Sequence, residues 1–397
     1  MLNILDLETA FAHRSNSNMR CAWILFTAIS SPVLVRIGKY LTQFAVKLQL
    51  PLNWLVKPTL YRHFVGGETL EECNPVVSNL ARFKVRSILD YSVEGSSSAD
   101  AMEAVLAETL RSIEKAKADP NVVFAVFKPT AFASEHILEK ASSGAPLDTN
   151  DQIELAAFRR RVHTLCNAAA KAGIPILIDA EDCHFQNAID QVTNEMMELF
   201  NKTTAIVFNT YQMYRTDRIE VLKNDHHRAI AKGYFLGAKF VRGAYMERER
   251  QRAEMFGYPS PIHSTKADTD RDYNAALAYS IEHIDRISIF NGTHNEESCL
   301  YLARLMEVKK LAHDDRRVWS SQLYGMSEHI SFNMAKAGYN VAKYVPYGPV
   351  RAVLPYLIRR AEENRSISGQ TSRELALIRM ELKRRKYQNA ATSRSIS

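Results

Sequence analysis

Lysine, histidine and acidic side chains stand directly after several short apolar segments of this chain. Lys128 follows VVFAVF, Asp179 closes IPILID with Glu181 two residues later, and His294 comes shortly after ISIF. A lysine in such a place could form a Schiff base. The other three side chains could hold a metal ion, although no HxH or HExxH spacing supports this. Alternatively, the cations could bind the diphosphate of an anionic cofactor, and spacing alone does not choose among the three chemistries.

Polar groups follow all of the apolar segments that resemble strands, within a few residues of the segment's end. They are Asp90 and Glu94, Lys128, and residues 179–181, 209–212, 242–245, 293–295, 322–325 and 344–348. One such position would mean little. Together, they predict a polar mouth built for a sizeable polar ligand, because the carboxyl ends of parallel strands meet at one edge.

The apolar segments alternate with longer amphipathic ones. We predict strands at 85–91, 122–127, 174–179, 205–209, 238–242, 287–290, 318–323 and 341–345. Nearly continuous apolar strands separated by helices indicate a parallel sheet covered on both faces. Such units over about 280 residues fit a closed (β/α)8 barrel of the TIM type. An open doubly wound sheet is the alternative, but the GxG and Gly-Lys-Ser/Thr motifs that would support it are missing.

The composition is that of an ordinary globular protein. Hydrophobic residues make up 46% and charged residues 24% of the 397 residues, which excludes a mainly disordered or fibrous chain. A formal net charge of +7 permits attraction to nucleic acid or anionic lipid without establishing either, and we expect no nucleic-acid partner. The 5 cysteines form no CxxC pair, so a reduced interior in a cytosolic-type compartment is expected. No metal site is expected.

The two ends of the chain lie outside the main strand pattern. Residues 1–84 are predicted to form a helical arm, and residues 85–397 the barrel with a basic tail at 383–386. The apolar run 21–35 is about 15 residues long, shorter than the roughly 20 that a spanning helix needs. Because Pro32 interrupts this run, we expect two helices packed on the main body, with contact to a membrane surface as the alternative.

Longer stretches around these residues carry a family resemblance. They are DAEDCHFQ (179–186), VFNTYQMY (207–214), GAKFVRGAYMERER (237–250), THNEES (293–298), QLYGM (322–326) and KYVPYGPVRAVLPYLIRRAEEN (343–364). The chain resembles the proline dehydrogenase family, and most closely its monofunctional, mitochondrial-like type. The resemblance implies FAD in a (β/α)8 barrel whose last helix lies over the barrel mouth. It also implies oxidation of L-proline to Δ1-pyrroline-5-carboxylate by hydride transfer to flavin N5, the first step of proline catabolism, with electrons passed to a membrane quinone.

The resemblance assigns flavin contacts to residues at the ends of the fourth and fifth predicted strands. Gln212 matches a hydrogen-bonding partner of the flavin ring. Lys239 and Arg242 match positions at the ring edge and at the ribityl–phosphate arm, and position 239 holds arginine in the bifunctional enzymes. Further positions expected at FAD are Gly243, Ala244, Thr265, Lys266, His294, Asn295, Gln322, Leu323, Arg360 and Glu363. Because the chain has no glycine-rich phosphate loop, side-chain cations have to bind the diphosphate.

Substrate recognition is expected mainly on the helix that follows the last strand. By its i, i+3, i+4 and i+7 spacing, one face of this helix presents Tyr356, Arg359, Arg360 and Glu363. By resemblance, Arg359 and Arg360 clamp the proline carboxylate with their guanidinium forks, and Lys128 adds a third positive charge. Asp179 is expected to hold Lys128 or another site group by charge. The remaining substrate contacts are expected from Ala244, Tyr245, Leu323 and Tyr356, with Glu94 pairing Arg359 as a gate.

Tyr344 bears on the choice between two related substrates. Proline dehydrogenases have tyrosine at this position, whereas hydroxyproline dehydrogenases resemble the same pattern with a serine that leaves room for a hydroxyl group. KYVPYG therefore favours L-proline. Hydroxyproline oxidation stays an alternative within the family, and a Schiff-base lyase using Lys128 an alternative of another class. The expected location is a bacterial cytoplasm, where peripheral contact with the inner membrane is an option, or the mitochondrion of a eukaryote.

Overall fold

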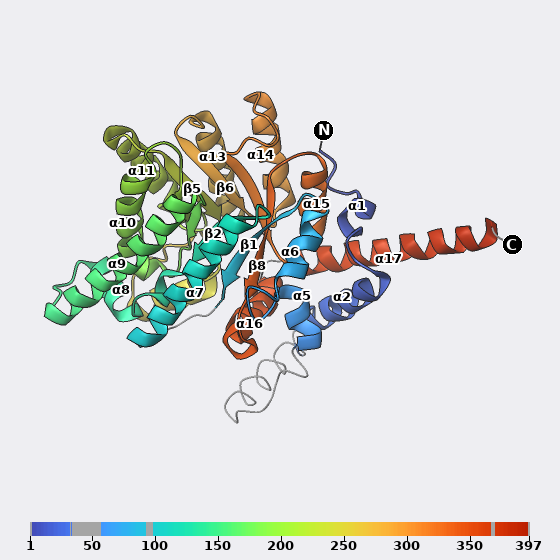
Figure 1. Ribbon diagram of the computed structural model, residues 1–397, viewed down its shortest axis with the longest axis horizontal. Helices are drawn as coiled ribbons and strands as arrows, with labels where there is room; N and C mark the ends of the chain where they lie inside the picture. The colour runs from blue at the N-terminus through green and yellow to red at the C-terminus, as the bar shows by residue number, and fades with distance from the viewer. Residues whose placement is uncertain (1, 32, 34–56, 93–97, 367–369, 396–397) are drawn as a thin grey trace.

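Eight parallel strands close into a barrel in the part of the chain that this computed structural model describes (Figure 1). The structure describes residues 2–31, 33, 57–92, 98–366 and 370–395, and the side chains of all of these except 58, 59, 359–371 and 389–395. The strands are β1 (Arg86–Tyr91), β2 (Val122–Phe127), β3 (Ile176–Ile178), β4 (Val207–Gln212), β5 (Leu236–Val241), β6 (Ile287–Gly292), β7 (Val318–Leu323) and β8 (Val341–Tyr347). Because β8 pairs in parallel with β1 along the whole of β1, the barrel is closed. The predicted (β/α)8 fold is confirmed.

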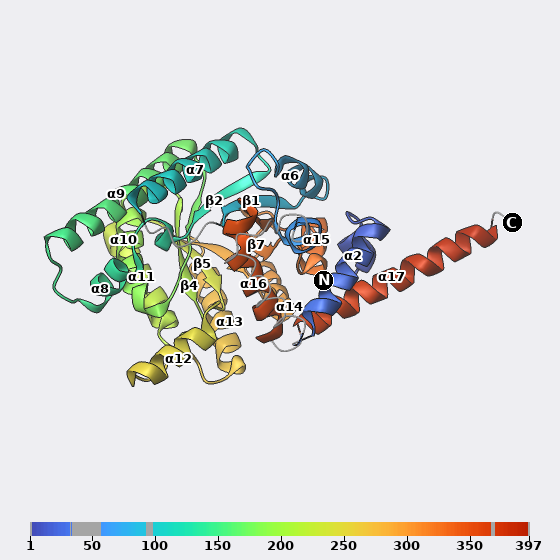
Figure 2. The same ribbon diagram turned by 90° about the horizontal axis from the view of Figure 1, so that it is seen from below.

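Helices alternate with the strands and cover the outside of the barrel (Figure 1, Figure 2). They are α7 (Ala99–Ala118), α8 (Glu135–Ser143), α9 (Thr149–Ala172), α10 (Cys183–Phe200), α11 (Arg218–Lys232), α12 (Met246–Phe256), α13 (Lys266–Glu282), α14 (Glu296–Val308) and α15 (Glu328–Lys336), with a 3-10 turn η2 (Pro129–Ala131). Local chemistry sets their ends. Asp148 begins α9 through a capping box with Asp151, and Gly173 ends it in the left-handed conformation at φ 69°.

Alternation along each strand divides side chains between the barrel interior and its outer layer. Phe124 lies inside, where it meets Phe208 and Phe290 edge-on with ring centroids 5.7 and 5.0 Å apart. Phe240 of β5 packs in the outer layer with the helices. Its neighbour Lys239 therefore faces the interior. β3 is shorter than the predicted 174–179, since the proline before it has no N–H to pair with a neighbouring strand.

The two ends of the chain pack on each other beside the barrel. The arm contains α1 (Leu7–Phe11), α2 (Asn16–Ile29), a π-helical turn η1 (Lys57–Tyr61), α5 (Arg62–Phe64) and α6 (Asn74–Ala81), and the other end contains α16 (Val350–Ser366) and α17 (Gln370–Ser395). α17 contacts α1 and α2 and extends away from the barrel in both views (Figure 1, Figure 2). Because α17 follows α16, the helix expected over the mouth is not the last one.

The apolar run 21–35 is described only in part. Helix α2 ends at Ile29, ahead of Pro32, and Pro32 and the second helix predicted there lie outside the described residues. None of the described helices combines the length and the apolarity needed to cross a membrane. The division of the chain at residue 84 stays a prediction, and Val77 and Leu80 of α6 belong to the same apolar core as the barrel helices.

A buried group of charges joins the arm to the barrel. The Arg14 guanidinium donates to Glu328 Oε1 at 2.9 Å, and the Lys343 ammonium of β8 lies 3.6 Å from Glu328 Oε2. Burial opposes ionisation, but Lys343, His13 and Arg14 lower the pKa of Glu328 to about 2. Removing Glu328 would leave both cations without their counter-charge, so this carboxylate holds the arm and the barrel together.

The free energy of unfolding is expected to fall as the pH decreases from 6.5 to about 4. Burial, assisted by Arg14 and Lys343, lowers the pKa of His13 to about 4, whereas the ring in the unfolded chain takes up a proton near 6.5. In this window the unfolded chain binds more protons, and acid therefore favours it. The His13 ring stacks on Phe332 with ring centroids 4.0 Å apart. His13→Phe keeps a ring at this place and should reduce the pH dependence measured by urea unfolding. An unchanged slope would contradict this assignment.

Candidate active site

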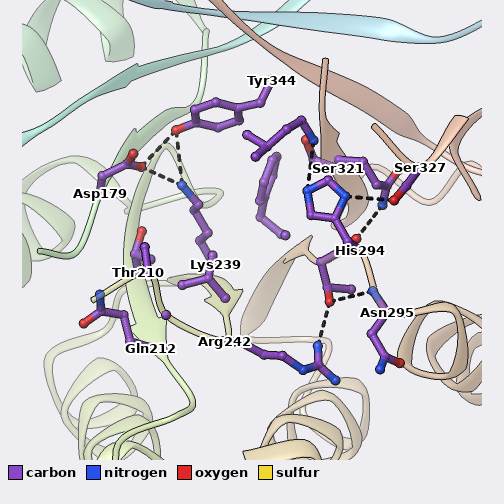
Figure 3. A pocket seen from close by; sticks show the side chains of 18 of the residues that line it. Asp179, Thr210, Gln212, Lys239, Arg242, His294, Asn295, Ser321, Ser327 and Tyr344 are labelled. Carbon is purple, nitrogen blue, oxygen red and sulfur yellow. Dashed lines mark hydrogen bonds and ion pairs between the residues drawn. The ribbon is translucent and has the colours of Figure 1, made fainter. Parts of the chain in front are cut away.

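A cavity opens at the carboxyl ends of the strands, where the chemistry of such barrels gathers. Its volume is about 560 Å³, within the range of small-molecule sites. Tyr356 of α16 and the first turn of α17, through Arg373 and Glu374, also line it. In Figure 3, side chains from β4, β5, β7 and β8 and from the loops after β3 and β6 point into the same space.

Three polar side chains from separate strands meet in the cavity (Figure 3). The Lys239 ammonium lies 2.6 Å from Asp179 Oδ1 and 3.2 Å from the Tyr344 hydroxyl, which in turn donates to Asp179 Oδ1 at 2.9 Å. Burial, reinforced by the charges of Asp179 and Asp90, raises the pKa of Tyr344 well above its ordinary value. The hydroxyl therefore stays protonated as a donor, and the Lys239 side chain is fixed in one place.

Lys128, directly after β2, pairs with Asp90 of β1. Its ammonium lies 3.1 Å from Asp90 Oδ2 and 3.3 Å from Oδ1, and the Ser92 hydroxyl donates to Oδ2 at 2.8 Å. The sequence alone leaves open which group Asp179 pairs with, and in the structure its partner is the Lys239 ammonium. The cavity thus has two lysine–aspartate pairs, Lys239 with Asp179 and Lys128 with Asp90, and all four residues line it.

Arg242, directly after β5, contacts three acceptors. Its Nε donates to Asp270 Oδ1 at 2.8 Å, and its other nitrogens donate to Thr293 Oγ1 at 2.6 Å and Ser298 Oγ at 3.0 Å. Lys266 pairs with the same Asp270 carboxylate. Burial alone would raise the pKa of Asp270, but hydrogen bonds and charges from Lys266 and Arg242 hold this pKa below its ordinary value. Two cations share one carboxylate, so this side of the cavity keeps a positive charge that suits an anion.

His294 and Asn295 follow β6 and have different surroundings. His294 Nδ1 lies 2.9 Å from Ser327 Oγ, and the backbone N–H of Leu323 points at its Nε2 over 3.4 Å (Figure 3). Asn295 begins α14, because its Oδ1 accepts the N–H of Ser298 at 2.8 Å. The His294 ring is thus held by the protein, whereas the Asn295 side-chain oxygen is occupied by the helix.

Two buried oxygens in the cavity, Gln212 Oε1 and Ser321 Oγ, have no hydrogen-bond partner among the described residues. Buried polar atoms nearly always have one, so both indicate a place for a ligand. Gly243, which also lines the cavity, has φ 130°, and a Cβ there would lie 2.5 Å from the Tyr214 ring. Only glycine allows the backbone to line the cavity at this point.

These features fit the flavin expected from the sequence. Gln212 Oε1 is a hydrogen-bond acceptor without a donor, and the ring system of a flavin carries an N–H group that could donate to it. Its dinucleotide form carries a diphosphate, whose charge suits Arg242 and Lys266. In the described part of the chain, no group of three or more His, Cys, Asp or Glu side chains is arranged to hold a metal ion.

Most residues predicted for the site line the cavity. They are Lys128, Asp179, Gln212, Lys239, Arg242, Gly243, Ala244, Tyr245, Lys266, His294, Asn295, Gln322, Leu323, Tyr344 and Tyr356. The Gln322 amide is held within the protein, donating to Thr293 O at 3.0 Å and accepting from Ser331 at 2.7 Å. Thr265 lies outside the cavity lining and begins α13 by accepting the N–H of Asp268. Glu94 lies outside the described residues, as do the side chains of Arg359, Arg360 and Glu363.

The sequence missed other lining residues. Phe290 lies within β6, and Ser321 lies within β7, two residues before the predicted Leu323. The two-residue alternation of strands could have found them. Arg373 and Glu374 begin α17 beyond the last strand, and no spacing in the sequence relates them to a strand end.

Comparisons with known proteins agree on one family. The family model for proline dehydrogenase matches residues 73–373. The carbapenem antibiotics biosynthesis protein CarD of Pectobacterium carotovorum subsp. carotovorum is 36% identical over 322 residues, covering 81% of this chain and 83% of that protein. The mitochondrial proline dehydrogenase 1 of Dictyostelium discoideum is 29% identical over 433 residues, covering 97% of this chain and 76% of that protein. That of Homo sapiens is 41% identical over 238 residues, covering 59% of this chain and 40% of the human protein.

Solved structures agree on the fold. Proline utilization A (PutA) from Bdellovibrio bacteriovorus, inactivated by N-propargylglycine, superposes with a TM-score of 0.72 at 20% identity, covering 91% of this chain and 38% of that one. A structure of a bifunctional PutA superposes with a TM-score of 0.67 at 21% identity, covering 82% of this chain and 33% of that one. The chain therefore spans little more than a third of these solved proteins, and the likeness concerns the fold.

The closed barrel and the polar cavity at the carboxyl ends of its strands are the features of a barrel enzyme. With the family model matched over residues 73–373, the chain belongs to the proline dehydrogenase family, which is flavin-dependent. The enzyme class expected from the sequence, a proline dehydrogenase of proline catabolism, is confirmed.

Asp179→Asn is expected to lower the free energy of unfolding by about 3 kcal/mol, because it leaves a buried ammonium without its carboxylate. Lys239 is only 5% exposed, so water replaces little of the lost interaction. The matched control is Glu198→Gln, which breaks the exposed Glu198–Lys232 pair and should cost less than about 1 kcal/mol. Urea unfolding measures both, and equal losses would contradict the importance given to the buried pair.

Proposed function

We propose that this chain oxidises L-proline to Δ1-pyrroline-5-carboxylate with bound FAD. The triangle of Lys239, Asp179 and Tyr344, in a cavity with the unpaired Gln212 Oε1, carries the proposal. When bound, the flavin supplies the two-electron acceptor for the C–H bond next to the proline nitrogen. The fixed Lys239 ammonium would stabilise negative charge that develops at the ring edge, at no cost of reorganisation.

The cofactor contacts are proposed from the lining residues and from the family resemblance. Gln212 Oε1 would accept a ring N–H, and Arg242 with Lys266 would bind the diphosphate. The wall formed by Leu323 and Tyr344 would exclude water from the ring. The remaining contacts are proposed for Gly243, Ala244, Thr265, His294, Asn295, Gln322, Arg360 and Glu363.

The carboxylate of proline is proposed to bind Arg359, Arg360 and Lys128. The two arginines share a helical face, and Lys128 lies in the cavity with its ammonium against Asp90. An ammonium held by a carboxylate has no free electron pair for attack on a carbonyl group, which disfavours a Schiff-base lyase. The apolar ring is proposed to lie against Ala244, Tyr245, Leu323 and Tyr356, with Glu94 as a gate.

Electrons are proposed to pass to a membrane quinone, and the chain to contact the membrane peripherally. The support for the acceptor is the family resemblance. Trp23 and Ile24 of α2 are 38% and 60% exposed, and the neighbouring α17 exposes Lys383 and Lys386. Apolar and basic groups together suit an anionic bilayer surface. The location would be the inner face of a bacterial inner membrane, or the mitochondrion of a eukaryote. Several relatives are named as mitochondrial enzymes.

The visible spectrum of the purified protein tests the activity. We expect a flavin absorption band that disappears on anaerobic addition of L-proline, since proline delivers two electrons to the cofactor. A band that persists would contradict the oxidation. A colourless protein that borohydride links covalently to its substrate would favour the lyase and Lys128 instead.

Tyr344→Ser is expected to shift the ratio of kcat/KM values toward trans-4-hydroxy-L-proline, relative to L-proline, by roughly tenfold or more. The smaller side chain makes room for the hydroxyl group beside the ring. Tyr344→Phe, the matched control, keeps the bulk and should keep the preference for proline. Steady-state kinetics with both substrates measures the ratio, and an unchanged preference in the serine variant would refute this role.

A further inference from the structure

The first turn of α17 reaches the cavity although it follows the helix expected to close the site. Arg373 and Glu374 both line the cavity, and Glu374 is only 3% exposed. Arg373 Nε pairs with Glu296 of α14 at 2.8 Å, and Glu296 also binds His329 of α15 at 2.9 Å. The start of α17 is thus tied to two barrel helices before it leaves the body of the protein.

Glu374 makes two contacts with one residue. Its Oε1 accepts the backbone N–H of Ser327 at 2.6 Å and the Ser327 hydroxyl at 3.2 Å. Ser327 is itself 1% exposed and has φ 50° and ψ 45°, a left-handed conformation that non-glycine residues rarely adopt. The carboxylate therefore stabilises a strained turn between β7 and α15.

The directions of these hydrogen bonds are set by chemistry. A carboxylate only accepts, so the Ser327 hydroxyl hydrogen points to Glu374. The Ser327 oxygen is then free to accept, and the His294 Nδ1 at 2.9 Å is the donor. The backbone N–H of Leu323 faces Nε2. The network thus assigns the hydrogen of His294 to Nδ1 and fixes the plane of its ring in the cavity (Figure 3).

We propose that Glu374 is a positioning residue that orients His294 through the hydroxyl of Ser327, and so increases the affinity of the cavity for FAD. The part that concerns FAD rests on the proposed function. A carboxamide at position 374 would keep the volume of the side chain. Its NH₂ group, however, can donate to Ser327, which lets the Ser327 hydroxyl reverse and the imidazole change its tautomer.

A double-mutant cycle on the full chain tests the coupling, with FAD affinity measured by titrating the apoprotein. Glu374→Gln and Ser327→Ala are each expected to weaken FAD binding by about fivefold to tenfold, the size of one lost hydrogen bond. In a His294→Ala background, Glu374→Gln should change the affinity by less than about twofold, because its effect acts through the imidazole. Wild-type affinity in Glu374→Gln, or an equal loss in both backgrounds, would overturn the proposal.

Glu381→Gln is the matched control on the same helix. Glu381 is also buried and pairs with Arg384 and Arg385 outside the cavity lining. The Glu381→Gln variant should lower the melting temperature of the apoprotein without changing its affinity for FAD. An equal loss of FAD affinity in this variant would mean that α17 acts only by its stability and would overturn the role of Glu374.

A second measurement does not depend on FAD. In apoprotein labelled with ¹⁵N-histidine, the ring signals of His294, identified by their loss in His294→Ala, should report a hydrogen on Nδ1. In Glu374→Gln they should shift toward the other tautomer, and an unchanged signal would overturn the proposal. If the wild-type chain binds no FAD while Glu374→Gln still shifts the His294 signals, the proposed function is contradicted and the positioning of His294 is supported.

Discussion

The ammonium of Lys239, buried inside the barrel between Asp179 and Tyr344, is the interaction around which the cavity is organised. A buried ammonium is tolerated only with a counter-charge and hydrogen bonds, and here these come from the end of β3 and from β8. These strands are far apart in the sequence and are neither adjacent to β5 nor to each other. Only a closed barrel in this register brings the three groups together.

The loops above this triangle are held by the two ends of the chain. Arg14 of the arm binds Glu328 at the start of α15, and Glu374 of α17 binds Ser327 immediately before it. Both contacts bear on the turn after β7, the strand whose last residue, Leu323, lines the cavity. Most of α17 extends away from the barrel, yet its first turn and the arm support the same side of the site.

The sequence predicted the barrel well because apolar strands and their polar ends repeat in order along the chain. It did not predict which lysine Asp179 would bind, since that depends on how the strands are staggered. It also gave no hint of Glu374, because a residue after the last strand has no position in the strand pattern. Asn295 and Gln322 are expected at FAD from the family resemblance, but the Asn295 side-chain oxygen and the Gln322 amide bind groups of the protein itself, which only the packed structure can show.

The central claim is that the charges at the strand ends form one site for a flavin and an amino acid. A crystal structure of the chain grown with FAD and a non-reactive cyclic analogue of proline tests it most directly. We expect the ring system beside Lys239, the diphosphate beside Arg242, and the carboxylate of the analogue beside Lys128. Electron density for FAD at another surface, with these three cations facing only water, would contradict the account.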